Sequence, residues 1–402
     1  MEQKYKIPPN SLKIDELGFL KLLKLTKKFS ETQKLKILEN IPSMKQWQFD
    51  DLYDDLKKEK RNISLTDIVP ETKDKYSLNN FKKFIDSKVV GQKDAKEKLI
   101  LAYYEHLIIK KEDDNYLKPN ALLIGPTGSG KTYMAYLLAK YTNKPFITAN
   151  AANMVSAGYV GTRLDDILTR LYINSDRNLE KAQNGIILID EFDKMIDHES
   201  HNSVGGVELQ QEFLKLIEGG KHICKAGLDR DASRIEIKTD NILFIFSGAF
   251  VKINDIVKKR HKNKNLGFKS HETNKNIEIN KEKHILHTDI IKYGIIPELV
   301  GRIQSIGILD KLSENDLFNI LKNTENPYLN SLNKFFEYHN ASISFTDGAL
   351  KEIASMAHEL ELGARGIKGI IDKVTQKLKF EVAKNNNKNF KITKNTIRKL
   401  YI

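Results

Sequence analysis

Residues 125–132 read Gly125-Pro126-Thr127-Gly128-Ser129-Gly130-Lys131-Thr132. An apolar run, Ala121–Ile124, precedes this stretch, and the helix-forming segment Tyr133–Lys140 follows it. The order strand, glycine-rich turn, helix is typical of a phosphate-binding loop, because glycines and a helix N-terminus present backbone N–H groups to an anion. Lys131 is expected to reach the β- and γ-phosphates, and Thr132 to ligate Mg²⁺. The sequence therefore predicts a site for a nucleoside triphosphate with Mg²⁺; the alternative is a glycine-rich turn that fits the pattern by accident.

Composition excludes several classes of protein. The chain has 402 residues, enough for two or three domains, and Cys224 is its only cysteine. An internal disulfide and a cysteine-based zinc finger are therefore excluded, and no zinc is expected. No apolar run approaches the roughly 18 residues of a membrane span, and residues 1–6 lead into neither a signal peptide nor a transit peptide. These features predict a soluble protein of the bacterial cytoplasm or of an organelle stroma or matrix, without a membrane partner.

The positive charge of the chain raises the question of nucleic acid. The formal net charge is +13, and Lys258–Lys264 is a concentrated basic run. Such a run fits either a nucleic-acid contact or a solvated surface loop. We expect the second, so nucleic acid is an unlikely partner.

Hydrophobic patterning divides the chain into three parts. Residues 1–80 read as short helices of unknown role. Residues 81–311 alternate short apolar runs with helical segments, which predicts a parallel sheet covered by helices. The expected strands are residues 121–124, 145–148, 185–189 and 242–246. Residues 312–402 read as a separate α+β unit. Between Lys252 and His287 a polar stretch shows no sustained period, and a long loop is expected there.

Two of the expected strands end in polar side chains. Asp190 and Glu191 follow the strand 185–189, at the edge of the sheet where α/β folds bind ligands. Asp190 would hold the hydration shell of Mg²⁺, and Glu191 would polarise the attacking water. An acidic pair can also simply cap a helix. Ser247 follows the next strand, where it would sense the γ-phosphate or serve as an ordinary turn residue.

Three further elements are open to two interpretations each. Gly158-Tyr159-Val160-Gly161 places an aromatic side chain between flexible glycines, which suits either a mobile tip that grips an extended chain or a simple turn. Arg302 and Arg365 could each stabilise charge at the γ-phosphate, in one case from a neighbouring subunit, or form surface ion pairs.

Taken together and in this order, the motifs resemble the ClpX family of AAA+ protein-unfolding ATPases over roughly residues 85–402. The resemblance rests on Val89-Val90-Gly91-Gln92, the phosphate-binding loop, Gly158–Gly161, Gln210-Gln211, Ser247–Phe250, Ile296–Arg302 and Gly363–Gly366. It implies an AAA+ P-loop NTPase large subdomain with a parallel sheet over 81–311 and a small α+β or helical subdomain over 312–402.

The same resemblance assigns roles to individual residues. It implies that Val89 and Val90 line the adenine pocket of an ATP site and that Glu191 is catalytic. Arg302 becomes an arginine finger that serves the neighbouring subunit, and Arg365 becomes a second sensor of the nucleotide.

The resemblance also implies partners. Members of the family form a homo-hexamer, thread unfolded or tagged proteins through its pore, and deliver them to a ClpP-type peptidase ring. Gly158-Tyr159-Val160-Gly161 would be the pore loop that grips substrate, and Leu266-Gly267-Phe268 the segment that docks on the peptidase. The chain itself is expected to have no protease activity.

The chain departs from the family pattern in three places. Residues 1–80 replace the usual zinc-binding domain, Thr162-Arg163 stands where acidic residues are usual, and Lys221–Lys238 lacks the Arg-Lys-His loop. Adaptors, natural substrates and degradation tags are therefore not predicted. The alternatives that stay open are an HslU-like unfoldase, a stand-alone remodelling chaperone and, less favoured, a nucleic-acid motor.

Overall fold

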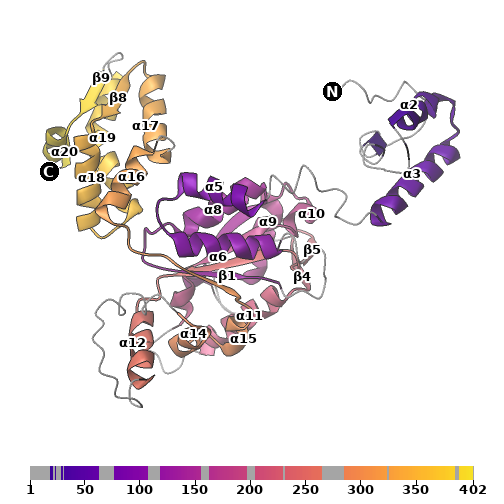
Figure 1. Cartoon of the computed structure of the whole chain (residues 1–402), viewed down its shortest axis with the longest axis horizontal. Coiled ribbons are helices and arrows are strands. Elements are labelled where there is room, and N and C mark those ends of the chain that lie inside the picture. Colours follow the sequence, from indigo (N-terminus) through magenta and orange to yellow (C-terminus); the bar gives the residue numbers. More distant parts are fainter. Residues whose placement is uncertain are drawn as a thin grey trace. The chain divides into compact units, whose positions relative to one another are not determined.

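The computed structural model describes residues 19–20, 23, 29, 31–62, 77–106, 118–154, 163–196, 204–229, 231–264, 285–323, 326–384 and 389–401. The predicted pore loop Gly158–Gly161 and the predicted docking segment Leu266–Phe268 lie outside these residues. The chain divides into two compact units, Met1–Ser77 and Leu78–Ile402 (Figure 1).

The first unit is helical where it is described. Its elements are α2 (Glu31–Asn40), the short 3-10 helix η2 (Ile41–Ser43) and α3 (Gln46–Asn62). Apolar side chains from both helices and from Phe19 and Leu23 form a small core of their own. The Phe19 and Phe49 rings lie 4.8 Å apart at its centre. Burial of these aromatic side chains supplies the hydrophobic stabilisation of a unit this small.

The second unit contains a five-stranded parallel sheet in the order β2-β3-β6-β1-β7. The strands are β1 (Ala121–Ile124), β2 (Phe146–Asn150), β3 (Ile186–Asp190), β6 (Leu243–Gly248) and β7 (Ser305–Ile308). The sequence predicted the first four. Strands β2 and β6 each run two residues beyond the predicted end, to Asn150 and Gly248. Strand β7 was missed because it is short and contains a glycine.

Helices cover both faces of this sheet, as Figure 1 shows. Because side chains alternate along a strand, Leu122 and Ile124 belong to one core and Ala121 and Leu123 to the other. One face carries α5 (Leu78–Lys88), α6 (Lys93–Tyr104) and α8 (Lys131–Thr142); the other carries α9 (Leu164–Asn174), α11 (Val204–Glu218), α14 (His287–Tyr293) and α15 (Pro297–Val300). The chain thus has the expected α/β fold, with β1 and β6 buried along their whole length.

Short elements complete this part of the chain. They are η4 (Ala151–Asn153), α10 (Leu179–Ala182), η5 (Phe192–Met195) and an antiparallel hairpin of β4 (Lys221–Lys225) and β5 (Arg234–Lys238). The hairpin was not predicted. Its inner face buries Cys224 and Ile237, while the alternate residues are exposed and mostly charged.

The prediction of a long loop after Lys252 is wrong for its first part. A long loop was expected, but Ile253–Lys264 forms helix α12, and α14 begins at His287. Ile253 and Val257 are buried on one face of α12, and Arg260 pairs with Asp289, whose side chain is fully buried. The helix was not predicted because Arg260, which the sequence suggests is a surface charge, forms an ion pair with a buried carboxylate. Arg260 therefore does not contribute to a surface patch for nucleic acid.

The C-terminal part forms its own core, within the same unit. Its elements are α16 (Glu314–Lys322), α17 (Pro327–Tyr338), β8 (Ser342–Phe345), α18 (Asp347–Glu359), α19 (Ala364–Lys384), β9 (Asn389–Ile392) and α20 (Lys394–Tyr401). Strands β8 and β9 pair in parallel. Ser313 and Asp316 form a capping box that fixes the start of α16.

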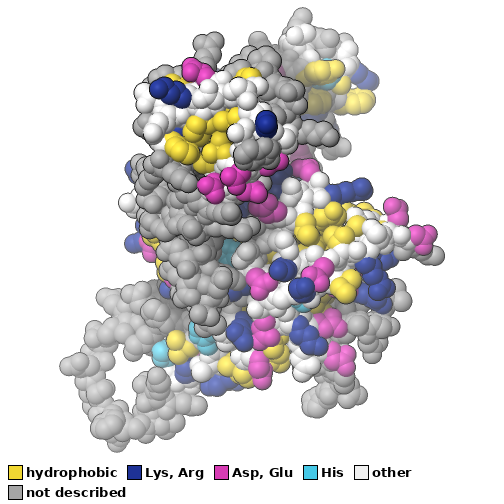
Figure 2. Space-filling view, turned by 90° about the vertical axis from the view of Figure 1, so that its right-hand side faces the viewer, with side chains coloured by type: hydrophobic (Ala, Val, Ile, Leu, Met, Phe, Trp, Pro, Cys, Tyr) yellow, Lys and Arg dark blue, Asp and Glu magenta, His cyan; other side chains and the backbone are white. Residues whose placement is uncertain are grey.

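In the lower part of the face seen in Figure 2, Lys and Arg side chains lie among Asp and Glu side chains over the described residues. In the part of the chain that the structure describes, no helix is both long and apolar enough to cross a membrane.

Candidate nucleotide-hydrolysis site

The loop between β1 and α8 has the backbone of an anion-binding turn. Gly128 and Gly130 take positive φ values of 77° and 105°, which other residues adopt only with strain. A side chain at Gly125 would lie 2.6 Å from the Leu309 carbonyl oxygen. The Gly125 N–H donates to the Gly248 carbonyl (3.1 Å), which ties the loop to the end of β6. The glycines are therefore required by conformation and by space, as the sequence pattern indicated.

Lys131 lies inside this loop. Its Nζ donates to the carbonyl oxygens of Gly125 (2.6 Å) and Pro126 (2.9 Å), and the residue is buried. Burial lowers the pKa of Lys131; the Asp190 carboxylate opposes this shift, and the Arg365 guanidinium adds to it. A cation held this way can exchange carbonyl partners for phosphate oxygens without moving far.

Asp190 connects three elements at the carboxyl end of the sheet. Its Oδ2 accepts from the Thr132 hydroxyl (3.0 Å), and its Oδ1 accepts from the Ser247 hydroxyl (2.6 Å). The structure thus brings together three side chains that the sequence placed 57 or 58 residues apart. Hydroxyl and carboxylate oxygens are the ligands that Mg²⁺ prefers, so this donor set fits the predicted ion.

Glu191 is exposed and points away from the core, with a left-handed φ of 56°. The Asn150 side-chain amide donates to Glu191 Oε2 (3.1 Å). Asn150 pairs in register with Asp190, at the end of the neighbouring strand. Sequence reasoning missed Asn150, because only the order of β2 and β3 in the sheet brings it to Glu191. This contact restrains the Glu191 carboxylate.

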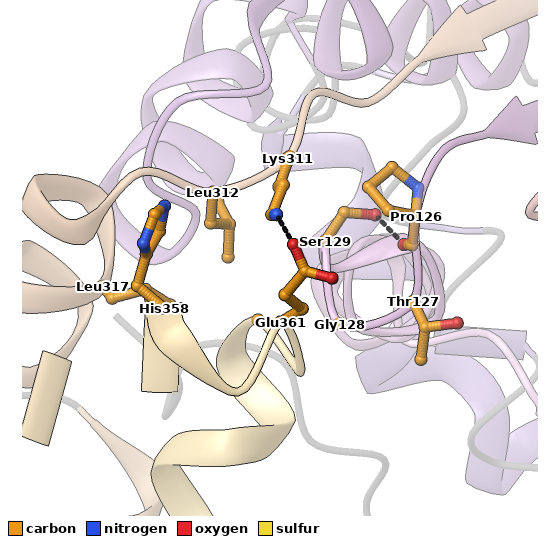
Figure 3. A pocket seen from close by; sticks show the side chains of 10 residues that line it. Pro126, Thr127, Gly128, Ser129, Lys311, Leu312, Leu317, His358 and Glu361 are labelled. Carbon is orange, nitrogen blue, oxygen red and sulfur yellow. Dashed lines mark hydrogen bonds and ion pairs between the residues drawn. The ribbon is translucent and has the colours of Figure 1, made fainter. Parts of the chain in front are cut away.

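The described pocket beside the loop lies between the sheet and the C-terminal helices (Figure 3). It is lined by residues 126–129 and by Lys311, Leu312, Leu317, His358, Glu361 and Gly363. Neither Val89, which is buried against α5 and α6, nor the half-buried Val90 is among these lining residues. Their predicted contact with adenine stays a prediction, and His358 and Leu317 are lining residues that the sequence analysis did not name.

The turn before α19 contacts the phosphate-binding loop directly. The Ala364 N–H donates to the Gly128 carbonyl oxygen (3.1 Å). A side chain on Gly128 would lie 2.2 Å from the Leu362 carbonyl oxygen, and one on Gly363 would lie 2.8 Å from the Gly128 oxygen. The two backbones therefore meet without intervening side chains.

The two predicted arginines lie in different surroundings. Arg365 is the second residue of α19, one residue after the contact with the loop, and its charge acts on the pKa of Lys131. Arg302 follows α15, is partly exposed and pairs with Glu218 (2.8 Å). Within one chain, the structure thus brings Arg365 to the loop, whereas Arg302 is held at the end of α11.

A side-chain clasp holds the segment that joins the two parts of this unit. The Gln92 amide donates to the Asp310 carbonyl (2.9 Å) and accepts from the Asp310 N–H (2.8 Å). The neighbouring residue Lys311 pairs with Glu361 on the other side of the pocket (2.6 Å), as Figure 3 shows. This hydrogen bond lowers the pKa of Glu361. The pair therefore links two lining residues of the pocket that come from different parts of the chain.

Reversing one charge of this pair is expected to open the pocket. Lys311→Glu should release a fluorescent ATP analogue about twofold to fivefold faster, a small effect because both side chains are largely exposed. The double variant Lys311→Glu/Glu361→Lys should recover the wild-type rate, since it restores the pair with its charges exchanged. Stopped-flow release of the analogue measures all three proteins. Equal rates for the single and double variants would show that the pair has no such role.

Comparisons with known proteins agree with this geometry. Residues 117–306 match the family described as AAA domain (Cdc48 subfamily). Residues 312–392 match the family described as the C-terminal, D2-small domain of ClpB protein. The chain therefore has the two subdomains of an AAA+ ATPase.

A curated relative narrows the family further. The ATP-dependent Clp protease ATP-binding subunit ClpX of Borrelia duttonii (strain Ly) is 37% identical over 314 residues, which cover 75% of this chain and 73% of the relative. The chain belongs to the ClpX family of AAA+ ATPases, and the resemblance seen in its motifs is confirmed.

Proposed function

We propose that the chain uses ATP hydrolysis to unfold proteins and to thread them through the pore of a homo-hexameric ring into a ClpP-type peptidase. Its membership of the ClpX family supports this proposal. The observation that carries it is the contact of Ala364 with the phosphate-binding loop at Gly128. A nucleotide on this loop lies beside the small subdomain, so its hydrolysis can alter how the two subdomains meet.

In the proposed reaction, the loop N–H groups and Lys131 bind the phosphates of ATP. Thr132 and Asp190 would hold Mg²⁺, which when bound neutralises phosphate charge. Glu191 orients a water molecule and takes its proton, while Asn150 restrains the carboxylate. Ser247 fixes Asp190 through the 2.6 Å hydrogen bond.

Two arginines would balance the negative charge of the γ-phosphate during hydrolysis. Arg365 approaches the γ-phosphate from the same chain, and Arg302 does so from the next subunit of the ring. An arginine that arrives from a neighbour makes hydrolysis depend on assembly. The Arg302–Glu218 ion pair would then exchange for a contact with phosphate when the ring forms.

Substrate and peptidase contacts fall on Tyr159 and on Leu266–Phe268. The Tyr159 ring, between Gly158 and Gly161, would press on an extended polypeptide without regard to its sequence. Leu266 and Phe268 would anchor the ring to apolar clefts of the peptidase. Both roles rest on the family resemblance and are tested together.

Two variants should separate unfolding from delivery. Tyr159→Ala is expected to lose ATP-dependent unfolding of a tagged fluorescent protein while it still hydrolyses ATP, because the channel loses its grip. Tyr159→Phe, which keeps the ring, is the control. Deletion of Leu266–Phe268 should leave unfolding intact and abolish degradation by an added ClpP-type ring, whereas deletion of the polar Asn274–Asn276 should not.

The outcomes distinguish the alternatives. Unfolding that survives Tyr159→Ala would refute the pore assignment. A wild-type chain that unfolds the substrate but never engages the peptidase would instead be a stand-alone remodelling chaperone.

A further inference from the structure

A buried carboxylate, that of Asp193, lies next to the acidic pair Asp190-Glu191. Asp193 is in η5, two residues beyond Glu191, and only 5% of it is exposed. Its oxygens accept from the backbone N–H groups of Ala249 (3.3 Å) and Phe250 (3.0 Å). None of the sequence motifs predicted a role for Asp193. Burying a carboxylate is costly unless hydrogen bonds compensate it, and these two N–H groups supply hydrogen bonds to Asp193.

The segment that Asp193 holds is the end of β6, just after Ser247. Phe250 has a left-handed φ of 48°, which a bulky side chain adopts only when its surroundings enforce it. Gly248 has no room for a side chain: one would lie 2.5 Å from Asp193 Oδ1 and 2.7 Å from the Phe250 ring. The Asp193 hydrogen bonds therefore hold a strained turn, residues 248–250, that packs directly against the Asp193 side chain.

The same turn sets the position of the Ser247 hydroxyl. Ser247 donates to Asp190 (2.6 Å), and the Gly248 carbonyl accepts from the Gly125 N–H (3.1 Å). A shift of the turn would therefore reach both the acidic pair and the first glycine of the phosphate-binding loop. Asp193 also acts on the pKa of Lys131, in the same direction as Asp190.

Neutral rings complete the surroundings of Asp193. The rings of Phe250 and Tyr293 lie 4.9 Å apart. Burial, with a smaller contribution from the Asp193 charge, raises the pKa of Tyr293 to about 12, so this phenol stays neutral. The charge of Asp193 is thus directed at the two backbone N–H groups of the turn.

We propose that Asp193 is a positioning residue for ATP hydrolysis. By holding the turn after β6 against the turn after β3, it fixes the distance from Ser247 to Asp190 and Glu191. Asp193 acts through Ser247 and does not touch the nucleotide. Its effect should therefore appear in turnover and not in binding.

Two variants of different severity test this inference. Asp193→Asn keeps the size of the side chain but can accept from only one of the two N–H groups, and we expect kcat for ATP to fall about tenfold. Asp193→Ala loses both bonds and should lower kcat about 100-fold. In each case KM for ATP and the affinity for a fluorescent ATP analogue should change less than twofold.

A double variant shows whether Asp193 acts through Ser247. If it does, adding Asp193→Asn to Ser247→Ala should lower kcat by much less than it does in the wild-type background. Independent, multiplicative effects would overturn the proposal.

The control is Asp289→Asn, which alters another buried carboxylate, at the start of α14. It should lower the melting temperature without changing kcat. If Asp289→Asn lowers kcat as much as Asp193→Asn does, or if Asp193→Asn raises KM and leaves kcat unchanged, Asp193 has only a structural role. Because Asp193→Asn conserves volume, it decides the question even if Asp193→Ala fails to fold.

Discussion

Replacing Glu191 with Gln is expected to lower ATP turnover at least about 100-fold and to leave ATP binding intact, since general-base catalysis contributes about 10² to 10⁴ in rate. The amide of Gln cannot take a proton from the attacking water. It can still accept the hydrogen bond from Asn150, and it suits the left-handed backbone at this position no worse than Glu does. Phosphate release in the steady state and binding of a fluorescent ATP analogue measure the two properties separately.

The control for this variant is Glu180→Gln, at an exposed carboxylate on α10. It removes the same charge from the same subdomain and should hydrolyse ATP at the wild-type rate. Wild-type turnover in Glu191→Gln would contradict the catalytic role of Glu191. The alternative interpretation, that the acidic pair only caps a helix, would then be favoured.

The second large effect is expected from a single methyl group outside the phosphate-binding loop. Gly363→Ala places a side chain 2.8 Å from the Gly128 oxygen, at a residue with φ of 56°. The left-handed conformation alone costs alanine about 1–2 kcal/mol. The contact must also separate the turn from the loop, so ATP affinity should fall about tenfold or more, since 1.4 kcal/mol corresponds to about a factor of ten.

Gly369→Ala is the matched control, because a side chain there meets nothing within 4 Å. It lies in α19, the helix that follows Gly363, where alanine is favoured over glycine by about 1 kcal/mol. This variant should bind ATP normally and melt at a slightly higher temperature. Equal ATP affinities for Gly363→Ala and Gly369→Ala would show that the contact with Gly128 does not support the nucleotide site.

The parts of the fold that the sequence predicted well are those set by local pattern. Strand β1, the glycine-rich loop and α8 follow one another within 22 residues and carry their own signals. Helix α12 was missed because its apolar residues are few and its buried Arg260 resembles a surface charge. Strand β7 and the hairpin β4–β5 lack the continuous apolar runs by which buried strands are recognised.

The site was predictable where it rests on single motifs and unpredictable where it rests on pairing between distant segments. Lys131, Asp190 and Glu191 were named from their positions after strands. The clasp between Gln92 and Asp310 joins residues 218 apart, and Lys311 meets Glu361 across 50 residues. Such contacts depend on how the two subdomains pack together, and no spacing of residues in the sequence predicts them.

The hydrogen bonds between Gln92 and Asp310 also make the connection between the two subdomains short. They fix Asp310 to the large subdomain, and the cap of α16 begins at Ser313, so only Lys311 and Leu312 lie between this clasp and the start of the small subdomain. Helix α19 starts at the phosphate-binding loop and is 21 residues long, and at 1.5 Å per residue its far end lies roughly 30 Å away. A rotation of about 10° at this short connection would sweep that far end through roughly 5 Å. That displacement corresponds to about one and a half residues of an extended polypeptide.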